Sequence, residues 1–202
     1  MLGLDDVKGS TRDQLALNYA IGGAQLAELV LAQRIVADAG QVVAVDASAT
    51  GDEDLDALLA KIAGSDRPRT PGHWVMKRRS AGVAVYARRL VAVRVLRGES
   101  RRLLGLVPRT VFPVVDTPTR DRTLAEIRAA LADPAAPPPR SAALIALLSA
   151  TGNAPRLIDD REQRARAKQI ASADVIASAV KRAVDAVRAV GVDAAGTAAG
   201  GC

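Results

Sequence analysis

Residues 18–35, NYAIGGAQLAELVLAQRI, decide the fold, because they form the most apolar stretch of the chain and contain two adjacent glycines, Gly22 and Gly23. Apolar side chains fall on nearly every face of the helix that we expect over residues 11–36, as in a central helix buried on all sides. Glycine inside a helix costs roughly 1 kcal/mol relative to alanine. We therefore predict that the glycine pair permits a close contact with another helix.

Two other interpretations of the glycine pair fit less well. A phosphate-binding loop needs the free amides of a helix start, whereas these glycines lie about three turns inside the predicted helix. They also lack a G-x-G-x-x-G context and a following Lys-Ser or Lys-Thr. A membrane span is disfavoured because Asn18, Gln25 and Glu28 interrupt a run that is shorter than the ~20 residues required.

The rest of the chain predicts one mainly α domain over residues 1–191, with a few short strands and a flexible tail over residues 192–202. Only Trp74, Phe112, Tyr19 and Tyr86 are aromatic, so the core must consist of aliphatic residues. We expect strands in MLGLDD, at residues 42–47 and within residues 101–116. Further helices are expected after Thr50 and over residues 73–97, 119–132, 140–152, 159–170 (a charged surface helix) and 172–190.

The net charge of +6 is unevenly distributed. Residues 1–66 carry −7, residues 67–110 carry +11 from 12 basic and 1 acidic residues, and residues 111–202 carry +2. A basic segment suggests an anionic partner, either a membrane surface or a nucleic acid. Arginine outnumbers lysine by 23 to 5, which is also typical of a GC-rich bacterial genome, so a solvated arginine-rich face is the alternative.

Few residues suited to catalysis or metal binding are present. His73 is the single histidine and Cys202 the single cysteine, which excludes His-pair zinc sites, Cys-rich zinc sites and disulfide frameworks. We interpret His73 as a helix-start residue beside a packed Trp74 rather than as part of a catalytic triad. The acidic run at residues 52–56 could bind a metal, but helix capping, with Thr50 and Glu53 as a capping box, explains it without a ligand. We expect no catalytic residues, metal or cofactor, and the absence of a signal-peptide pattern predicts a cytoplasmic protein.

Several short motifs follow one another in an order that resembles the Golgi phosphoprotein 3 family, in its bacterial branch. The most specific is G-x-x-L-x-E-L-x-L-x-x-R-I at residues 23–35, followed by T-G-D-x-x-L-D-x-L at residues 50–58. HW at the start of a basic helix, LLGLVPRTVFPVVD and RSAALIALLSATG complete the series. The resemblance therefore extends over nearly the whole chain.

This resemblance implies both a fold and a function. The implied fold is a central helical bundle wrapped by amphipathic helices, with short hairpins. Eukaryotic members are peripheral membrane proteins that bind phosphatidylinositol 4-phosphate in a basic pocket, insert an apolar hairpin into the bilayer and act as adaptors for membrane enzymes. Counting back from Glu28, the family's pocket tryptophan and arginine positions correspond to Asp13 and Gly22.

The resemblance and the charge pattern together give candidate site residues. Arginine forks suit phosphate groups, and cations near headgroups attach a protein to a membrane surface. Contacts with lipid headgroups are expected from Arg140, Arg12, Lys77, Arg78, Arg88 and Arg89. Leu157 and Ile158 are the expected membrane contacts, because they are the strongly apolar residues of TGNAPRLIDD, which follows the RSAALIALLSATG helix where the family has its inserted hairpin.

The leading hypothesis is a non-enzymatic, peripheral membrane-binding protein that contacts anionic lipid headgroups of the phosphoinositide type, in the cytoplasm and at the inner face of the membrane. One alternative is a protein-interaction scaffold, an adaptor or a homo-oligomer, without lipid binding. A further alternative is nucleic-acid binding through residues 67–110, although that segment lacks interleaved aromatic residues and helix-turn-helix spacing, and no specific nucleic acid is expected.

Overall fold

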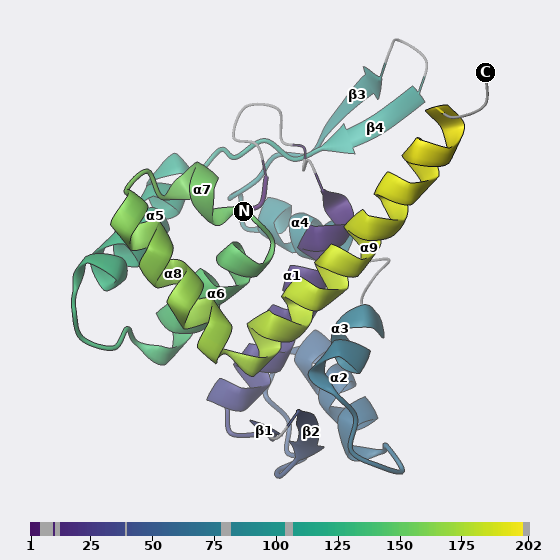
Figure 1. Cartoon of the computed structure of the whole chain (residues 1–202), viewed down its shortest axis with the longest axis vertical. Helices are drawn as coiled ribbons and strands as arrows, with labels where there is room; N and C mark the ends of the chain where they lie inside the picture. Colours follow the sequence, from purple (N-terminus) through teal and green to yellow (C-terminus); the bar gives the residue numbers. More distant parts are fainter. Residues whose placement is uncertain (5–9, 11–12, 39, 78–81, 104–106, 200–202) are drawn as a thin grey trace.

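The computed structural model describes residues 1–4, 10, 13–38, 40–77, 82–103 and 107–199, and these residues form a mainly α domain (Figure 1). The two small sheets are antiparallel hairpins, β1–β2 and β3–β4. The elements in chain order are α1 (Gln14–Leu31), β1 (Ile35–Asp38), β2 (Gln41–Ala44), α2 (Glu53–Ala63), α3 (Pro71–Lys77), α4 (Gly82–Ala92), β3 (Glu99–Leu103), β4 (Val107–Val111), α5 (Thr117–Ala132), α6 (Pro139–Ala150), α7 (Ala154–Leu157), α8 (Arg161–Ala173) and α9 (Val175–Ala199).

Helix α1 is the central element, as the sequence predicts, and it contacts α3, α4, α6 and α9. In Figure 1, α9 crosses in front of α1, with α5–α8 on one side and α2, α3 and the β1–β2 hairpin on the other. A Cβ on Gly23 would lie 2.6 Å from Val180 Cγ2 and 2.8 Å from Leu147 Cδ2. The close helix contact predicted for this glycine is therefore confirmed, and its partners are α9 and α6.

Capping side chains set the helix boundaries. Helix α1 begins later than predicted because Asp13 is its cap and accepts a hydrogen bond from the Ala16 amide at 2.8 Å. The cap of α2 is Asp52 rather than the predicted Thr50, since its carboxylate accepts bonds from the amides of Asp54 and Leu55. The Thr50 hydroxyl bonds Asp56 instead, at 2.7 Å, so it fixes the loop that precedes the helix.

Of the helix expected over residues 73–97, the structure describes α3 and α4, and residues 78–81 lie outside the described residues. Helix α4 ends at Ala92 because the chain turns there, with Arg94 in the left-handed region at φ 59°. Residues 1–4 form a turn, with the Leu4 amide bonded to the Met1 carbonyl, rather than part of the strand expected in MLGLDD. Helix α9 extends to Ala199, beyond the boundary expected at residue 191, and the division into domain and tail stays a prediction.

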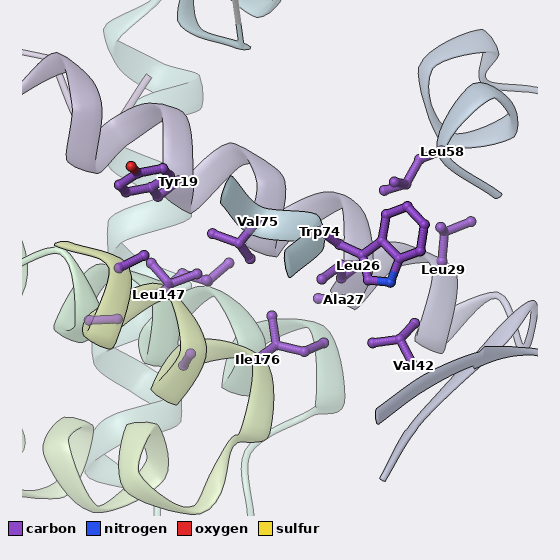
Figure 2. Close-up of a cluster of buried hydrophobic side chains, with 14 of the residues drawn as sticks. Tyr19, Leu26, Ala27, Leu29, Val42, Leu58, Trp74, Val75, Leu147 and Ile176 are labelled. Carbon is purple, nitrogen blue, oxygen red and sulfur yellow. The ribbon is translucent and has the colours of Figure 1, made fainter. Parts of the chain in front are cut away.

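The main core surrounds α1. Figure 2 shows the Trp74 indole of α3 among Leu29, Leu58 and Val42, which belong to α1, α2 and β2. His73 lies beside it with ring centroids 5.1 Å apart, edge to face, which agrees with the interpretation of His73 as a helix-start residue beside a packed tryptophan. A second apolar cluster joins α5, α6, α7 and α8. Helix α6 contributes to both clusters and so connects the outer helices with the core around α1.

Candidate functional site

Arg140, one of the cations expected to contact lipid headgroups, lies in the first turn of α6 and is already paired. Its Nε donates to Glu28 Oε1 at 3.1 Å, and its Nη2 donates to Glu28 Oε2 at 2.5 Å. This two-point contact raises the pKa of the Arg140 guanidinium. The side chain is 76% exposed, yet its charge is balanced by a carboxylate that is 112 residues away in sequence.

Arg89 of α4 is neutralised in the same way. Its guanidinium contacts Asp52 at 2.9 Å and Asp54 at 3.1 Å, and it lies 5.3 Å from the centre of the Tyr86 ring. Asp52 and Arg140 both line one cavity beside α1, so the structure brings Arg89 and Arg140 to the same part of the molecule. Both arrive there with their charges balanced by acidic side chains.

The other predicted cations do not join them as a group. The Lys77 ammonium lies 4.9 Å from the centre of the Trp74 ring, and Arg88 is exposed on α4. Arg12 and Arg78 lie outside the described residues. Two further arginines of the basic segment, Arg97 and Arg101, share the single carboxylate of Glu99. Glu99 is already counted in the +11 charge of residues 67–110, so it is the contacts of Arg89 with Asp52 and Asp54, from outside that segment, that offset part of this charge.

The predicted membrane contacts are core residues in this structure. Leu157 is 7% exposed and Ile158 is 1% exposed. Both pack in the second apolar cluster, together with residues of α5, α6 and α8 such as Leu124 and Ala167. This placement does not support a bilayer contact by Leu157 and Ile158, because the protein core already covers their apolar surface.

A different group of cations lines a hollow of about 560 Å³ between the end of α6, α7 and α8, here called the α8 hollow. Arg161, Arg164 and Lys168 are three and four residues apart, so they lie on one face of α8. The described lining contains no carboxylate; its other members are Ser149, Gly152, Ala154, Pro155 and Ala165. The hollow therefore concentrates positive charge without internal compensation.

The acidic residues of α8 point to other surroundings. Asp160 caps the helix by accepting a bond from the Gln163 amide, and with Glu162 it lines a separate hollow towards the α5–α6 loop. Among the described residues, Arg161 and Lys168 form no ion pair. Arg164 donates to the Ile158 carbonyl at 3.3 Å, a neutral partner that leaves its positive charge unbalanced.

Ser149 adds a hydroxyl group to the same hollow. Its Oγ is buried and has no hydrogen-bond partner, although a serine inside a helix usually donates to the carbonyl four residues earlier. An unsatisfied buried hydroxyl is costly, so a group that binds it contributes net stabilisation. Two guanidinium groups and one ammonium group make the α8 hollow a candidate site for a phosphate or similar anion.

Sequence reasoning missed this hollow because it treated residues 159–170 as a solvated surface helix. A signal was present: the three cations recur at helical spacing, while Glu162 falls on the other face. What the sequence does not contain is the partner surface of α6 and α7, which turns one exposed face into a concave site.

Residues 1–187 match the family model described as Golgi phosphoprotein 3 (GPP34). The chain belongs to the Golgi phosphoprotein 3 family. No curated protein matches it. Golgi phosphoprotein 3 proteins form a non-enzymatic family, and membership indicates interaction with lipids or proteins as the general kind of function.

Two positions distinguish this Golgi phosphoprotein 3 chain from the pocket that the resemblance implies. Asp13, at the expected tryptophan position, caps α1 and also pairs with Arg188 of α9 at 3.0 Å. Gly22, at the expected arginine position, is buried within α1. No helix in the described part of this family member has the length and hydropathy needed to cross a bilayer.

Proposed function

We propose that this Golgi phosphoprotein 3 family chain is a non-enzymatic peripheral membrane protein that binds phosphorylated, anionic lipid headgroups through the α8 hollow. The observation that carries the proposal is the set of three cations, Arg161, Arg164 and Lys168, around a concave surface whose described lining holds no carboxylate. Family membership supports a lipid or protein ligand as the general class. By family resemblance, phosphatidylinositol 4-phosphate is the headgroup to test first.

The electrostatic free energy expected from these three cations is sufficient for reversible attachment to a membrane. Each Lys or Arg close to an anionic bilayer contributes about 1 kcal/mol. Three such residues give roughly 3 kcal/mol, which corresponds to an increase of about 100-fold in partitioning. This attraction is electrostatic, so it falls as salt shortens the screening length to about 8 Å at physiological ionic strength.

The proposal assigns a smaller role to Arg140 and Arg89 than the sequence did. A headgroup phosphate at either guanidinium must compete with a carboxylate that is already in contact, Glu28 in one case and Asp52 in the other. Arg161 and Lys168 carry no such competitor among the described residues. Attachment through α8 would hold the protein at the cytoplasmic face of a membrane without insertion of Leu157 or Ile158.

Vesicle flotation tests the proposal. Vesicles of phosphatidylcholine alone are compared with vesicles that also contain phosphatidylinositol 4-phosphate, and with vesicles that contain phosphatidylserine at equal total charge. We expect the protein to float with both anionic vesicle mixtures at low salt and to lose this binding as the salt concentration rises. Stronger binding to the phosphoinositide vesicles than to the phosphatidylserine vesicles would show that the hollow recognises the headgroup phosphate. Equal recovery with neutral and anionic vesicles would overturn the proposal.

A matched pair of variants connects the result to the hollow. The triple variant R161Q/R164Q/K168Q should lose most of the anionic binding. The control K61Q/R122Q/R182Q removes the same charge from exposed positions on α2, α5 and α9, and it should retain most of it. Equal losses in both variants would show that net charge alone drives binding, whereas no vesicle binding by the folded wild type would favour a protein-interaction scaffold.

A further inference from the structure

The β1–β2 hairpin lies near one end of the long axis of the molecule (Figure 1), and its two edges differ. On the β2 side, the Val42 amide donates to the Arg69 carbonyl at 2.8 Å, so a neighbouring segment covers that edge. On the β1 side, no other strand in the described part of the chain pairs with the hairpin. An unpaired strand edge is a template for pairing with another chain.

The register of the hairpin fixes which backbone groups point out of the β1 edge. In an antiparallel pair, successive residues alternate between bonding the partner strand and pointing away from it. The Arg34 carbonyl accepts a bond from the Val45 amide at 2.9 Å, which places Arg34, and Val36 two residues later, among the positions that bond across the hairpin. Ile35 and Ala37 therefore direct their amides and carbonyls to the uncovered edge.

The β1 edge is held in place by the core. Ile35 is 2% exposed, and the Ile35 and Ala37 side chains pack against the main core around α1. On the opposite face of the hairpin, Val36 and Val43 are directly paired and are 48% and 44% exposed. A strand that is already ordered loses little freedom when it pairs with another strand. Exposed valines on an uncovered edge also favour such pairing.

The sequence RIVAD, from Arg34 to Asp38, is complementary to an antiparallel copy of itself. With Val36 on a two-fold axis, Ile35 of one copy lies opposite Ala37 of the second copy, and the two residues exchange both of their outward hydrogen bonds. The same register places Arg34 opposite Asp38 of the second copy, so that opposite charges face each other. Arg34 also contacts a carboxylate of its own chain at 2.8 Å, and Asp38 interacts within its own chain, so these charges help to select the register and the backbone bonds hold the pair.

We propose that the β1 edge pairs with the β1 edge of a second copy, so that two hairpins form one four-stranded antiparallel sheet. The two Val36 side chains meet on the axis, and the Val43 side chains extend the same apolar face. One short strand pair is small compared with the about 1,200–2,000 Å² of stable interfaces, so the dimer forms reversibly. This inference does not rest on the α8 hollow or on membrane binding.

Sedimentation velocity of the full chain, from micromolar to near-millimolar concentration, tests the pairing. We expect a monomer–dimer equilibrium that shifts with concentration. Val36→Lys brings two ammonium groups face to face on the axis and should raise the dimer dissociation constant by about tenfold or more.

Val43→Lys is the matched control, because it adds the same charge to a similarly exposed valine on the same face. The two Val43 positions are three strand spacings apart in the dimer, about 14 Å, which is beyond the screening length of about 8 Å, so this variant should dimerise nearly as the wild type does. A wild-type protein that stays monomeric would overturn the proposal and leave the β1 edge to an extended peptide of another protein. Equal losses in Val36→Lys and Val43→Lys would overturn it in favour of association through the valine face.

A disulfide tests the register itself, in a Cys202→Ser background that removes the single native cysteine. Val36→Cys places two thiols across a non-hydrogen-bonded pair, where the Cα atoms are about 4.5 Å apart, within the range of about 4.4–6.8 Å that a disulfide spans. We expect a covalent dimer on mild oxidation, and none with Val43→Cys. Equal cross-linking of the two variants would contradict the register.

Ala37→Pro tests the backbone bonds. It removes one outward amide without removing a bond within the hairpin, and it should abolish dimerisation. A dimer that persists in folded Ala37→Pro would overturn the proposal. Val36 is exposed and tolerates substitution, so Val36→Lys and Val36→Cys decide the question if Ala37→Pro does not fold.

Discussion

Substitution of Gly23 by alanine tests the packing around which the fold is built. The new Cβ would lie 2.6 Å from Val180 Cγ2 and 2.8 Å from Leu147 Cδ2, whereas non-bonded carbons prefer about 3.5–4.0 Å. Leu147 can move its methyl group by rotating its side chain, but a valine in a helix has one strongly preferred rotamer, so Val180 cannot. The clash must therefore displace α1 and α9 from each other.

Two opposing terms give the size of the effect. Alanine gains about 1 kcal/mol over glycine in helix propensity, and overpacking a core costs about 1–3 kcal/mol. Because one of the two contacts is rigid, we take the upper part of that range and expect net destabilisation of about 1–2 kcal/mol. Urea unfolding followed by Trp74 fluorescence measures it, since this buried indole is the only tryptophan.

Two comparison variants make this result specific. Gly72→Ala is the control, because a Cβ there meets only Thr70 Oγ1, at 3.9 Å, and the protein should be unchanged or more stable by up to about 1 kcal/mol. In a Val180→Ala background the clash with Cγ2 is gone, so Gly23→Ala should become stabilising. A Gly23→Ala protein as stable as the wild type, or the same destabilisation in the Val180→Ala background, would refute the packing argument.

Three further predictions follow from the described contacts. Leu157→Ala should cost about 2–5 kcal/mol of stability, as a buried leucine does, and leave vesicle flotation of the folded protein unchanged; unchanged stability with lost flotation would instead indicate a membrane contact. In a double-mutant cycle by urea unfolding, Glu28→Gln and Arg140→Gln should show a coupling of only about 0.2–1 kcal/mol, because the pair is exposed. The Thr50 amide and hydroxyl lower the pKa of Asp56, so this carboxylate stabilises the fold above its unfolded pKa of about 3.9 and the contribution is lost as pH falls through the lower folded value. Urea titrations below about pH 4 should accordingly show a shallower acid-induced loss in Asp56→Asn than in the wild type.

The sequence predicted the α1 packing because that information is local. A glycine inside an apolar helix identifies a close contact, although it does not name Val180 or Leu147 as the partners. The helix boundaries were less predictable, since Thr50 and Asp52 are both good capping residues and the choice between them depends on where Asp56 lies. The sequence also placed the break between α8 and α9 within two or three residues of its position at Asp174. The Asp174 carboxylate accepts a bond from the Ala177 amide, and this cap fixes where α9 begins.

The candidate site was harder to predict, because a cation is available to a ligand only if no carboxylate reaches it in the folded chain. Four acidic side chains of residues 1–66 pair with arginines from three later parts of the chain: Glu28 with Arg140, Asp52 and Asp54 with Arg89, and Asp13 with Arg188. Each pair joins residues at least 35 positions apart, so no segmental count of charge can reveal it.

This pairing reverses the expectation drawn from charge density. Residues 67–110 carry the highest positive charge in the sequence, yet contacts with Asp52 and Asp54 offset part of it. Helix α8 carries both signs and borders two hollows: Arg161, Arg164 and Lys168 line the α8 hollow, whereas Asp160, Glu162 and Arg166 line the other. For this reason we propose the anion site on the mixed helix α8, where no carboxylate lines the hollow, rather than on the more basic segment, where carboxylates distant in sequence already contact Arg89.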